Sequence, residues 1–402
     1  MEHTVIINRS EIRATPEEKL EKLKTRNVST PDDQQPSGDV DLNKFMDFNL
    51  YEAAKSGDAN KFIKALEEVS VSKKLALSLI FNQVTPSGNS LLHVAASSEK
   101  EDVTKLILSH FPYLMTRKNC SEDTPLHVAA QNKKSAMQLL LEKDREITYQ
   151  ESLDQKIMYW KNKDGKSPLY LAAKTGCLEI LRLLLEASAQ DGAYAVKMEG
   201  MSLVLAALEE GKSDTLKAII DQLPKLLHVR DEDGATPLHY AALVGNVEAV
   251  KLLLEKCHYL AFQTDKNGSY PIHIACQNGH VDTIRKLVEK WPDLAEMKNK
   301  KDQNVLHVAA EGGKIEAVEY ILKNSAIEKL VNSKDVDGNT ALHLASMHNH
   351  CPVLLSLTKR SNLNPKLLNN DNLTALDVAM EPESSNDPAV VQFWLQALFS
   401  VN

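Results

Sequence analysis

The sequence predicts an all-α solenoid of about nine to ten stacked helix-turn-helix repeats, joined by hairpin loops that we call fingers. Three observations lead to this prediction. A motif containing Leu-His recurs at nearly constant spacing, most motifs are followed by a glycine and an apolar helical run, and aliphatic residues dominate the apolar composition. Hydrophobic residues make up 43% of the 402 residues and aromatic residues only 5%. Such a repeat buries its apolar face against its neighbours, so a long chain needs no second core.

A histidine marks the register of the repeats. It recurs at six positions, His93, His127, His239, His273, His307 and His343. Tyr170, Val204 and Asp377 take its place in three further units, and the successive steps are 34, 43, 34, 35, 34, 34, 36 and 34 residues. Ankyrin repeats have a period of about 33 residues. The sequence therefore predicts an ankyrin-repeat solenoid over residues 41–380, with a looser first unit that begins near Leu50.

The clearest unit shows why this pattern forms a helix pair. Thr236 suits the N-cap of the first helix, where its hydroxyl can accept a hydrogen bond from an early helical N–H. Pro237 suits the first helical position, because the N–H that it lacks would have no partner there. Gly245 suits the left-handed turn that ends this helix. The leucines at 252–254 are expected to fill the interior, and Asp233-Gly234 is a tight-turn signal for the finger.

Two units depart from the pattern. The 43-residue step holds an insertion around Asp144–Trp160. The unit at Met198–Ile220 lacks the Thr-Pro pair, and its glycine is displaced. Tyr170 can replace the marker histidine as a polar group, whereas Val204 cannot. We therefore expect a weaker junction between repeats at Val204.

The two ends of the chain differ from the repeats. Residues 1–40 are polar and are expected to form a disordered arm, in which only Glu17–Lys24 could form a short helix. A phosphorylated or partner-binding tail is the alternative. Residues 381–402 are expected to form an apolar helix that completes the last repeat, because nine of the eleven positions in 389–399 are apolar. We expect a partner, a second copy or a membrane surface to cover this helix, or else a tolerated exposed patch.

Composition narrows the class of partner and the compartment. The net charge of −8 and the pI near 5.9 argue against a nucleic-acid partner. The five cysteines are scattered and form no Cys-x-x-Cys pair, which is typical of reduced thiols in the cytosol. No signal peptide opens the chain, and the longest apolar run is Leu203–Leu208, against the roughly 20 residues of a spanning helix. We therefore expect a cytoplasmic protein.

The histidines raise the question of a metal site. Zinc ligands lie about 2 Å from a shared ion, whereas stacked helices lie about 10 Å apart. Histidines of neighbouring repeats therefore cannot share an ion, and we expect them to hydrogen-bond adjacent fingers. His348–Cys351 is the best local metal candidate, but two ligands one residue apart rarely converge, so a structural or surface role is favoured. No nucleophile elbow, P-loop or carboxylate pair is present, and we expect no enzyme activity, cofactor or metal.

The register also predicts where a partner binds. Stacks of this kind bind through finger tips and the exposed edge of the first helices, which form a concave surface. The predicted contact residues are Glu232, Asp233, Lys266, Asn267, Lys300, Lys301 and Asp337 on finger tips, and Leu243, Val244, Gln277, Asn278 and Met347 on first helices. The tips read acidic, basic, basic, acidic, which suits a patterned protein partner.

Leu243 and Val244 stand out because the repeat usually tolerates polar residues there. They are predicted to form an apolar anchor in the middle of the groove. The alternative is that they pack locally against the preceding repeat.

The residues of several repeat segments indicate a particular group within the ankyrin-repeat proteins. The segments at 167–173, 270–275, 303–310 and 367–377 resemble plant ankyrin proteins of the accelerated-cell-death type, and the resemblance covers about residues 45–380. It implies cytosolic ankyrin repeats followed by several membrane-spanning helices, and roles in plant defence, cell-death control and salicylic-acid-linked signalling. It also implies the cytosolic face of the plasma membrane or endoplasmic reticulum. Because the chain stops at Asn402, we expect either a truncated or processed form or a member without the membrane domain.

Three functional hypotheses remain open. The first is a non-catalytic protein–protein interaction module of a membrane-associated plant regulator of defence and cell death, without nucleic-acid or small-molecule ligands. The alternative is a soluble ankyrin scaffold or inhibitor that binds a protein client unrelated to defence. The third is an enzyme fragment whose catalytic domain lies outside these residues, which rests on fold-level grounds only.

Overall fold

The computed structural model describes residues 14–26, 44–98, 100–131, 134–148, 156–188, 192–209, 211–324 and 328–380. They belong to two compact units, Met1–Glu199 and Gly200–Asn402, and each unit is described by itself. The described residues are helical apart from turns and one isolated bridge between Phe45 and Val84. The predicted all-α solenoid is thereby confirmed within each unit.

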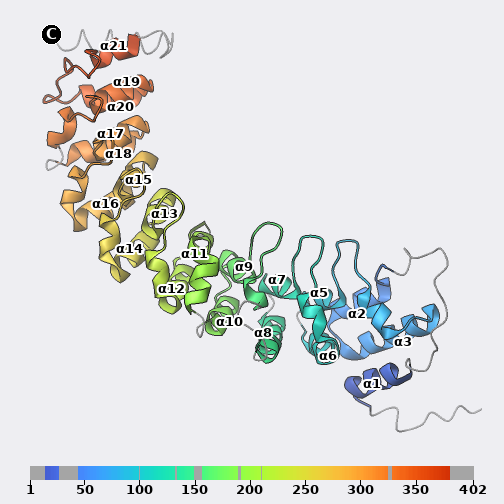
Figure 1. The fold of residues 1–402 in the computed structure, drawn as a ribbon. Helices are drawn as coiled ribbons and strands as arrows, with labels where there is room; N and C mark the ends of the chain where they lie inside the picture. The colour runs from blue at the N-terminus through green and yellow to red at the C-terminus, as the bar shows by residue number, and fades with distance from the viewer. Residues whose placement is uncertain are drawn as a thin grey trace, which may run out of the picture. The chain divides into compact units, whose positions relative to one another are not determined.

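Unit 1 contains two rows of stacked helices (Figure 1). The first helices α2 (Phe48–Ser56), α5 (Leu91–Ala96), α7 (Pro125–Ala130) and α9 (Pro168–Thr175) pack each on the next. The second helices α3 (Ala59–Lys73), α6 (Asp102–His110), α8 (Lys134–Thr148) and α10 (Leu178–Ser188) form the other row. The remaining elements are α1 (Pro16–Arg26), α4 (Leu77–Asn82) and two short 3-10 helices, η3 (Pro112–Thr116) and η5 (Ile157–Tyr159).

Unit 2 repeats this plan more regularly. Its first helices are α13 (Pro237–Val244), α15 (Pro271–Asn278), α17 (Val305–Glu311), α19 (Ala341–Met347) and α21 (Ala375–Met380). Its second helices are α12 (Ser213–Gln222), α14 (Val247–Lys256), α16 (Val281–Lys290), α18 (Ile315–Lys323) and α20 (Cys351–Thr358). Neighbouring helices of each row are in contact. The 3-10 helices are η7 (Pro224–His228), η8 (His258–Phe262), η9 (Pro292–Glu296) and η10 (Glu328–Asn332).

The helix pair of α13 and α14 shows how the motif works. Pro237 occupies the first turn of α13, and Gly245 ends it with φ 74°. Ala241 and Ala242 are fully buried, which lets neighbouring helices approach closely. Leu253 and Leu254 are buried as predicted, whereas Leu252 is half-buried. Gly245 thus ends α13 locally, and the helix buries the face that packs against the next repeat.

The 3-10 turns that follow most second helices were not predicted from the sequence. Five of them carry a buried leucine at the third position, namely Leu114, Leu226, Leu260, Leu294 and Leu330. Three of them begin with a proline, at Pro112, Pro224 and Pro292. A Pro-x-Leu motif after the second helix therefore indicates such a 3-10 turn. The turn adds one apolar contact before the chain enters the finger.

The two irregular units have distinct structures. In the 43-residue step, α8 runs on to Thr148, residues 149–155 lie outside the described part, and η5 follows with Ile157, Met158 and Tyr159 buried. In the degenerate unit, α11 (Gly192–Glu209) is interrupted at Gly200, whose φ of 51° and ψ of −133° are not helical. The division between the two units falls at this glycine.

The stretch expected to be a disordered arm contains a docked helix. Helix α1 includes the short helix foreseen at Glu17–Lys24, but it also packs against α3. Leu20 is fully buried and Leu23 is 8% exposed. The expectation of a disordered arm is therefore wrong for residues 16–26, and the rest of it lies outside the described residues. An 11-residue helix is marginal alone, so docking on α3 stabilises it, and a single sequence does not reveal that contact.

The apolar C-terminal helix expected at 381–402 lies outside the described residues, so that expectation stays a prediction. Within the described residues, no helix combines the length and the apolar character needed to cross a bilayer.

Leu20→Ala tests the docking of α1. We expect a loss of about 2–3 kcal/mol from the docking of this helix, because a fully buried leucine side chain is removed. Hydrogen exchange of the α1 amides should become much faster, while the repeats unfold at nearly the same temperature. Lys22→Ala, at an exposed position of the same helix, serves as the control. Unchanged exchange in Leu20→Ala would contradict the docking.

Candidate functional site

The marker histidines connect each first helix to the following finger. In α13, the backbone N–H of Thr236 donates to His239 Nδ1 at 3.1 Å, and the Thr236 hydroxyl lies 2.9 Å from the same atom. The opposite nitrogen, Nε2, lies 2.9 Å from the carbonyl oxygen of Ser269 in the next repeat. A backbone N–H only donates and a carbonyl only accepts. The ring is therefore neutral, with its proton on Nε2.

The other five marker histidines make the same pair of contacts. In each one, Nδ1 accepts from the backbone N–H three residues earlier, at 3.1–3.3 Å. The Nε2 partners are carbonyl oxygens at 2.8–3.1 Å, namely Asp123 for His93, Lys166 for His127, Met297 for His273, Ser333 for His307 and Leu373 for His343. These are the contacts expected of residues that hold adjacent repeats together. The Thr236 side chain also takes part in a capping box with the backbone N–H of His239, as predicted for the N-cap of this helix.

Burial keeps these histidines uncharged. Loss of water around the ring lowers the pKa of His93, His273 and His307 to about 4. The pKa values of His127, His239 and His343 are lowered for the same reason. A proton on Nδ1 would also face the backbone N–H that donates to it. The seams between repeats therefore depend on the neutral form.

Backbone hydrogen bonds also link the finger tips of unit 2. The N–H of Lys266 donates to Asp233 O at 2.8 Å, and that of Lys300 donates to Asn267 O at 3.0 Å. The N–H of Val336 donates to Lys301 O at 3.0 Å. Lys300 adds one side-chain link, from its Nζ to Lys266 O at 2.6 Å, and the side chains at the tips are exposed to solvent.

A second set of histidines was not anticipated. His280 Nε2 lies 2.9 Å from Leu243 O, and His350 Nε2 lies 3.0 Å from Glu311 O, at the C-terminal ends of the preceding first helices. The left-handed glycines leave room for these rings. A Cβ on Gly245 would come within 2.5 Å of the His280 ring, and one on Gly313 within 2.6 Å of the His350 ring. A histidine just before the second helix, with a glycine one repeat earlier, was the signal.

This contact also bears on the local metal candidate at His348–Cys351. The His350 ring hydrogen-bonds a backbone carbonyl and stacks on the His348 ring, with centroids 5.8 Å apart. Among the described residues, no three His, Cys, Asp or Glu side chains are placed to hold a metal ion.

All twelve predicted contact residues lie in unit 2. We call the surface formed by fingers 231–235, 265–269, 299–303 and 335–339 and helices α13, α15, α17 and α19 the finger face. The finger-tip residues Glu232, Asp233, Lys266, Asn267, Lys300, Lys301 and Asp337 are exposed, as is Gln277, whereas Asn278 and Met347 are half-buried. Leu243 is 43% exposed and Val244 is 46% exposed. Neither side chain therefore belongs to the buried core.

A groove of about 350 Å³ is set into the finger face between finger 335–339 and helices α17 and α19. Carboxylates dominate its charge, and they come from three successive repeats: Glu311, Asp335, Asp337 and Asp371. Among its lining residues, Lys301, Asp337 and Met347 were predicted from the sequence as contact residues, and His348 belongs to the local metal candidate. The other members escaped notice because they are far apart in the chain.

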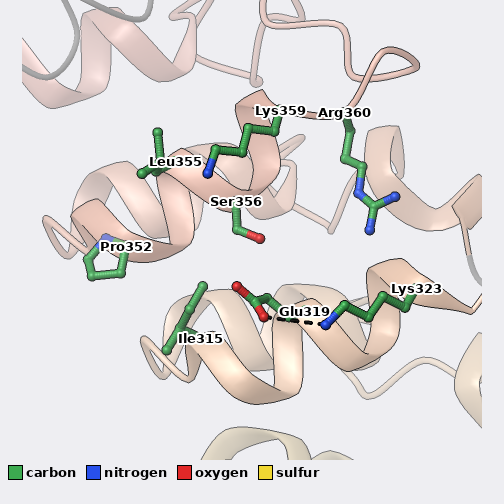
Figure 2. A pocket seen from close by; sticks show the side chains of 8 residues that line it. All are labelled: Ile315, Glu319, Lys323, Pro352, Leu355, Ser356, Lys359 and Arg360. Carbon is green, nitrogen blue, oxygen red and sulfur yellow. Dashed lines mark ion pairs between the residues drawn. The ribbon is translucent and has the colours of Figure 1, made fainter.

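Another groove, of about 460 Å³, lies between the second helices α18 and α20. Figure 2 shows Pro352 and Ile315 at one end and Arg360 and Lys323 at the other. Lys323 pairs with Glu319 at 3.6 Å and lies in the last turn of α18. Cations at helix C-termini compensate the partial negative charge of the helix end, and that charge disfavours an anion. This groove is therefore a weaker candidate for a binding site than the finger face.

Comparison with known proteins decides the family. A family model of three ankyrin repeats matches residues 50–151, 203–299, 257–332 and 293–369, and a single ankyrin repeat matches 164–192. Together these matches cover more than half of the chain. The chain belongs to the ankyrin-repeat family. Ankyrin repeats are typically non-catalytic modules for protein–protein interaction, which is the class of function that the sequence predicts.

Two ankyrin-repeat relatives were found among characterised proteins. Protein ACCELERATED CELL DEATH 6 of Arabidopsis thaliana is 31% identical over 362 residues, covering 78% of this chain and 54% of that protein. ANK repeat-containing protein nipk-1 of Caenorhabditis elegans is 29% identical over 126 residues, covering 31% of this chain and 20% of that protein. The chain thus spans about half the length of the Arabidopsis relative. The similarity to that protein supports the resemblance seen in the sequence motifs.

The neutral histidines predict how the stability of the ankyrin repeats depends on pH. Between the unfolded-state pKa near 6.5 and the folded-state pKa of about 4, the unfolded chain binds a proton that the buried ring does not. The contribution of each such histidine to the free energy of unfolding is therefore complete above pH 6.5. It falls by about 1.4 kcal/mol per pH unit as the pH decreases below that value. Urea unfolding between pH 7.5 and 5 measures the slope.

His273→Gln isolates one of these contributions. It should lower stability at pH 7.5 and reduce the slope by about one proton. His258→Gln, at an exposed histidine on η8, is the control, because water reaches that side chain in both states. An unchanged slope in His273→Gln would show that this ring does not stay neutral on folding.

Gly245→Ala tests the packing of the second histidine set. The Cβ must adopt φ 74° and also displace the His280 ring from Leu243 O. We expect a loss of about 2–4 kcal/mol, measured by urea unfolding. Gly211→Ala is the matched control in the same unit, because its φ is +68° and no atom lies within 4 Å of the added Cβ. Its loss should be about 1–2 kcal/mol, and equal losses would rule out a role for the His280 contact.

Proposed function

We propose that this chain is the protein-binding module of a plant regulator of defence and cell death, and that it binds its protein partner through the finger face. The Arabidopsis relative, whose name refers to cell death, supports the biological role. The resemblance in sequence to plant ankyrin proteins with a membrane domain supports work at the cytosolic side of a membrane. The negative net charge and the alternating charges of the finger tips favour a protein over a polyanion.

One observation carries the choice of surface. Leu243 and Val244 are exposed neighbours at the C-terminal end of α13, on the same face as fingers whose backbones are linked by hydrogen bonds. Large exposed apolar side chains flanked by charged ones are typical of the centre of a protein interface. The preceding tip is acidic, with Glu232 and Asp233, and the following tip carries Lys266. An apolar anchor on the same face as tips of opposite charge would contribute to both the affinity and the orientation of binding.

The concave arrangement usual in ankyrin repeats favours this face over the second helices. On the finger face, side chains from several repeats can reach one partner at once. The rigid backbone of the fingers also limits the entropy lost on binding. The finger face is therefore the surface on which mutation should separate binding from stability.

The double variant Leu243→Ser/Val244→Ser tests this function in the full chain. Capture of partner proteins from plant cytosol and membrane extracts should weaken by about 1–3 kcal/mol, or roughly 5- to 150-fold. The free energy of unfolding should change by less than about 0.5 kcal/mol per site, because both side chains are exposed. Tyr259→Ser, which removes an apolar side chain 61% exposed on η8, is the matched control.

Two results would count against the proposal. Equal loss of binding in Tyr259→Ser would show that capture does not depend on the finger face. Recovery of the wild-type chain with soluble proteins alone, and with no component of defence signalling, would contradict the membrane-associated defence role.

A further inference from the structure

The groove on the finger face holds more negative charge than the described residues neutralise. Glu311, Asp335, Asp337 and Asp371 line it, and none of them forms an ion pair with a described residue. Lys301 is the cation in the lining, and it too has no ion-pair partner there. Four carboxylates thus share a space of about 350 Å³. Their mutual repulsion is relieved only by something that brings positive charge.

Asp335 is the buried member of this group and has an acceptor without a partner. Its side chain is only 8% exposed. Its Oδ1 accepts from the N–H of Asp337 at 3.0 Å and of Asn339 at 2.8 Å, which shapes the finger. Its Oδ2 has no hydrogen bond or ion pair to any described residue, and the residue lines the groove. A nearly buried carboxylate oxygen therefore faces the groove without a donor.

In three other fingers of this unit, both side-chain atoms at this position have partners within the chain. Asn299 Nδ2 donates to Gln303 Oε1 at 2.9 Å, and Asn369 Nδ2 donates to Asn339 Oδ1 at 3.1 Å. Asp231 accepts a hydrogen bond at Oδ2 from the Tyr240 hydroxyl at 2.5 Å. Asp265 lacks such a partner but is more exposed to water than Asp335. Asp335 thus differs from Asn299, Asn369 and Asp231 in leaving one acceptor without a partner within the described chain, and from Asp265 in being less exposed.

The neighbouring side chain that could supply a donor is engaged elsewhere. Gln303, which precedes the N-cap residue of α17, donates from Nε2 to Glu311 Oε2 at 2.9 Å. Its Oε1 accepts a hydrogen bond from Asn299 Nδ2. Burial raises the pKa of Asp335, and the negative charges of Asp337 and Glu311 raise it further. The electrostatic field in the groove therefore favours a cation.

The spacing of the carboxylates decides between kinds of cation. A divalent metal needs ligands about 2–2.6 Å from one centre, and no three acidic, histidine or cysteine side chains of the described residues are placed to provide that. A guanidinium group presents five donors in a planar fork and can reach carboxylates that are separated. Its apolar stem suits Leu344 and Met347, which also line the groove.

We propose that this groove binds an arginine side chain of the protein partner, with Asp335 Oδ2 as the acceptor that the described chain leaves without a donor. Glu311 and Asp337 supply further acceptors at its rim. This inference rests on the proposed function and adds the chemistry of the partner: a basic segment whose arginine enters between finger 335–339 and α19. Lys301 lies beside the groove and limits how many cations can enter, so a single arginine fits better than a polybasic run.

Titration of the full chain with N-acetyl-arginine-amide, followed by amide NMR on deuterated protein, tests the site. Shifts should centre on finger 335–339 and on Met347. Asp335→Asn should weaken binding roughly tenfold, because a charge-assisted hydrogen bond to a buried acceptor is lost. N-acetyl-citrulline-amide, which has nearly the same shape without the charge, should bind at least tenfold more weakly than the arginine probe to the wild-type chain.

The chain itself indicates that Asp335→Asn will fold, because Asn299 and Asn369 occupy the same position in neighbouring fingers. Asp293→Asn, at an exposed aspartate on η9, is the matched control for loss of one negative charge in this unit. Equal affinity of wild-type and Asp335→Asn chains for the arginine probe would overturn the proposal. So would equal binding of citrulline, or shifts confined to another surface.

Partner capture separates this inference from the proposed function. If Asp335→Asn loses the arginine probe but captures partners as well as wild type does, the groove takes no arginine from the partner, and the inference fails while the proposed function stands. If Leu243→Ser/Val244→Ser leaves capture unchanged while Asp335→Asn still loses the probe, the anchor of the proposed function fails and the arginine site remains.

Discussion

The structure depends on a neutral imidazole held between two backbone groups of different repeats. Each marker histidine accepts from an N–H at the start of its own helix and donates to a carbonyl in the following repeat. Both partners are main-chain atoms, so no side chain can replace them or adjust to their loss. Because the ring is buried, the bond is protected from competition with water. One residue per repeat thereby sets the position of the next finger relative to the helix before it.

Fixing the fingers through backbone atoms leaves their tips free to vary. The tips at 232–233, 266–267 and 300–301 differ in charge, yet the same main-chain hydrogen bonds connect them. Changes in tip charge therefore cost little stability and alter mainly the recognition of partners. Asp335 is an exception, because it is nearly buried and belongs both to the turn of its finger and to the surface of the groove. Negative charge is kept there against the cost of burial.

The features predicted from the sequence are those that local residues determine. The period, the helix starts at Pro237 and Pro271 and the left-handed ends at Gly245 and Gly279 follow from neighbours within a few positions. The docking of α1, the contact of His280 with Leu243 and the acidic groove were missed, because they join residues separated by 30 or more positions or by three repeats. The anchor at Leu243 and Val244 was visible as apolar residues at a position normally polar, although its role in binding remains a prediction.

The degenerate unit shows what happens where the histidine is absent. Val204 is fully buried and offers no donor, so the finger at 231–235 receives no imidazole from the preceding helix. Arg230, which immediately precedes that finger, donates to Gly234 O within it at 2.6 Å and to Thr264 O of the following repeat at 2.7 Å. Tyr240 adds a hydrogen bond to Asp231 within the same repeat. The guanidinium bonds are exposed and contribute less than a buried imidazole, but they are independent of pH because arginine stays charged. The finger that lacks an imidazole contact is thus linked to the following repeat by a side-chain contact of a different kind.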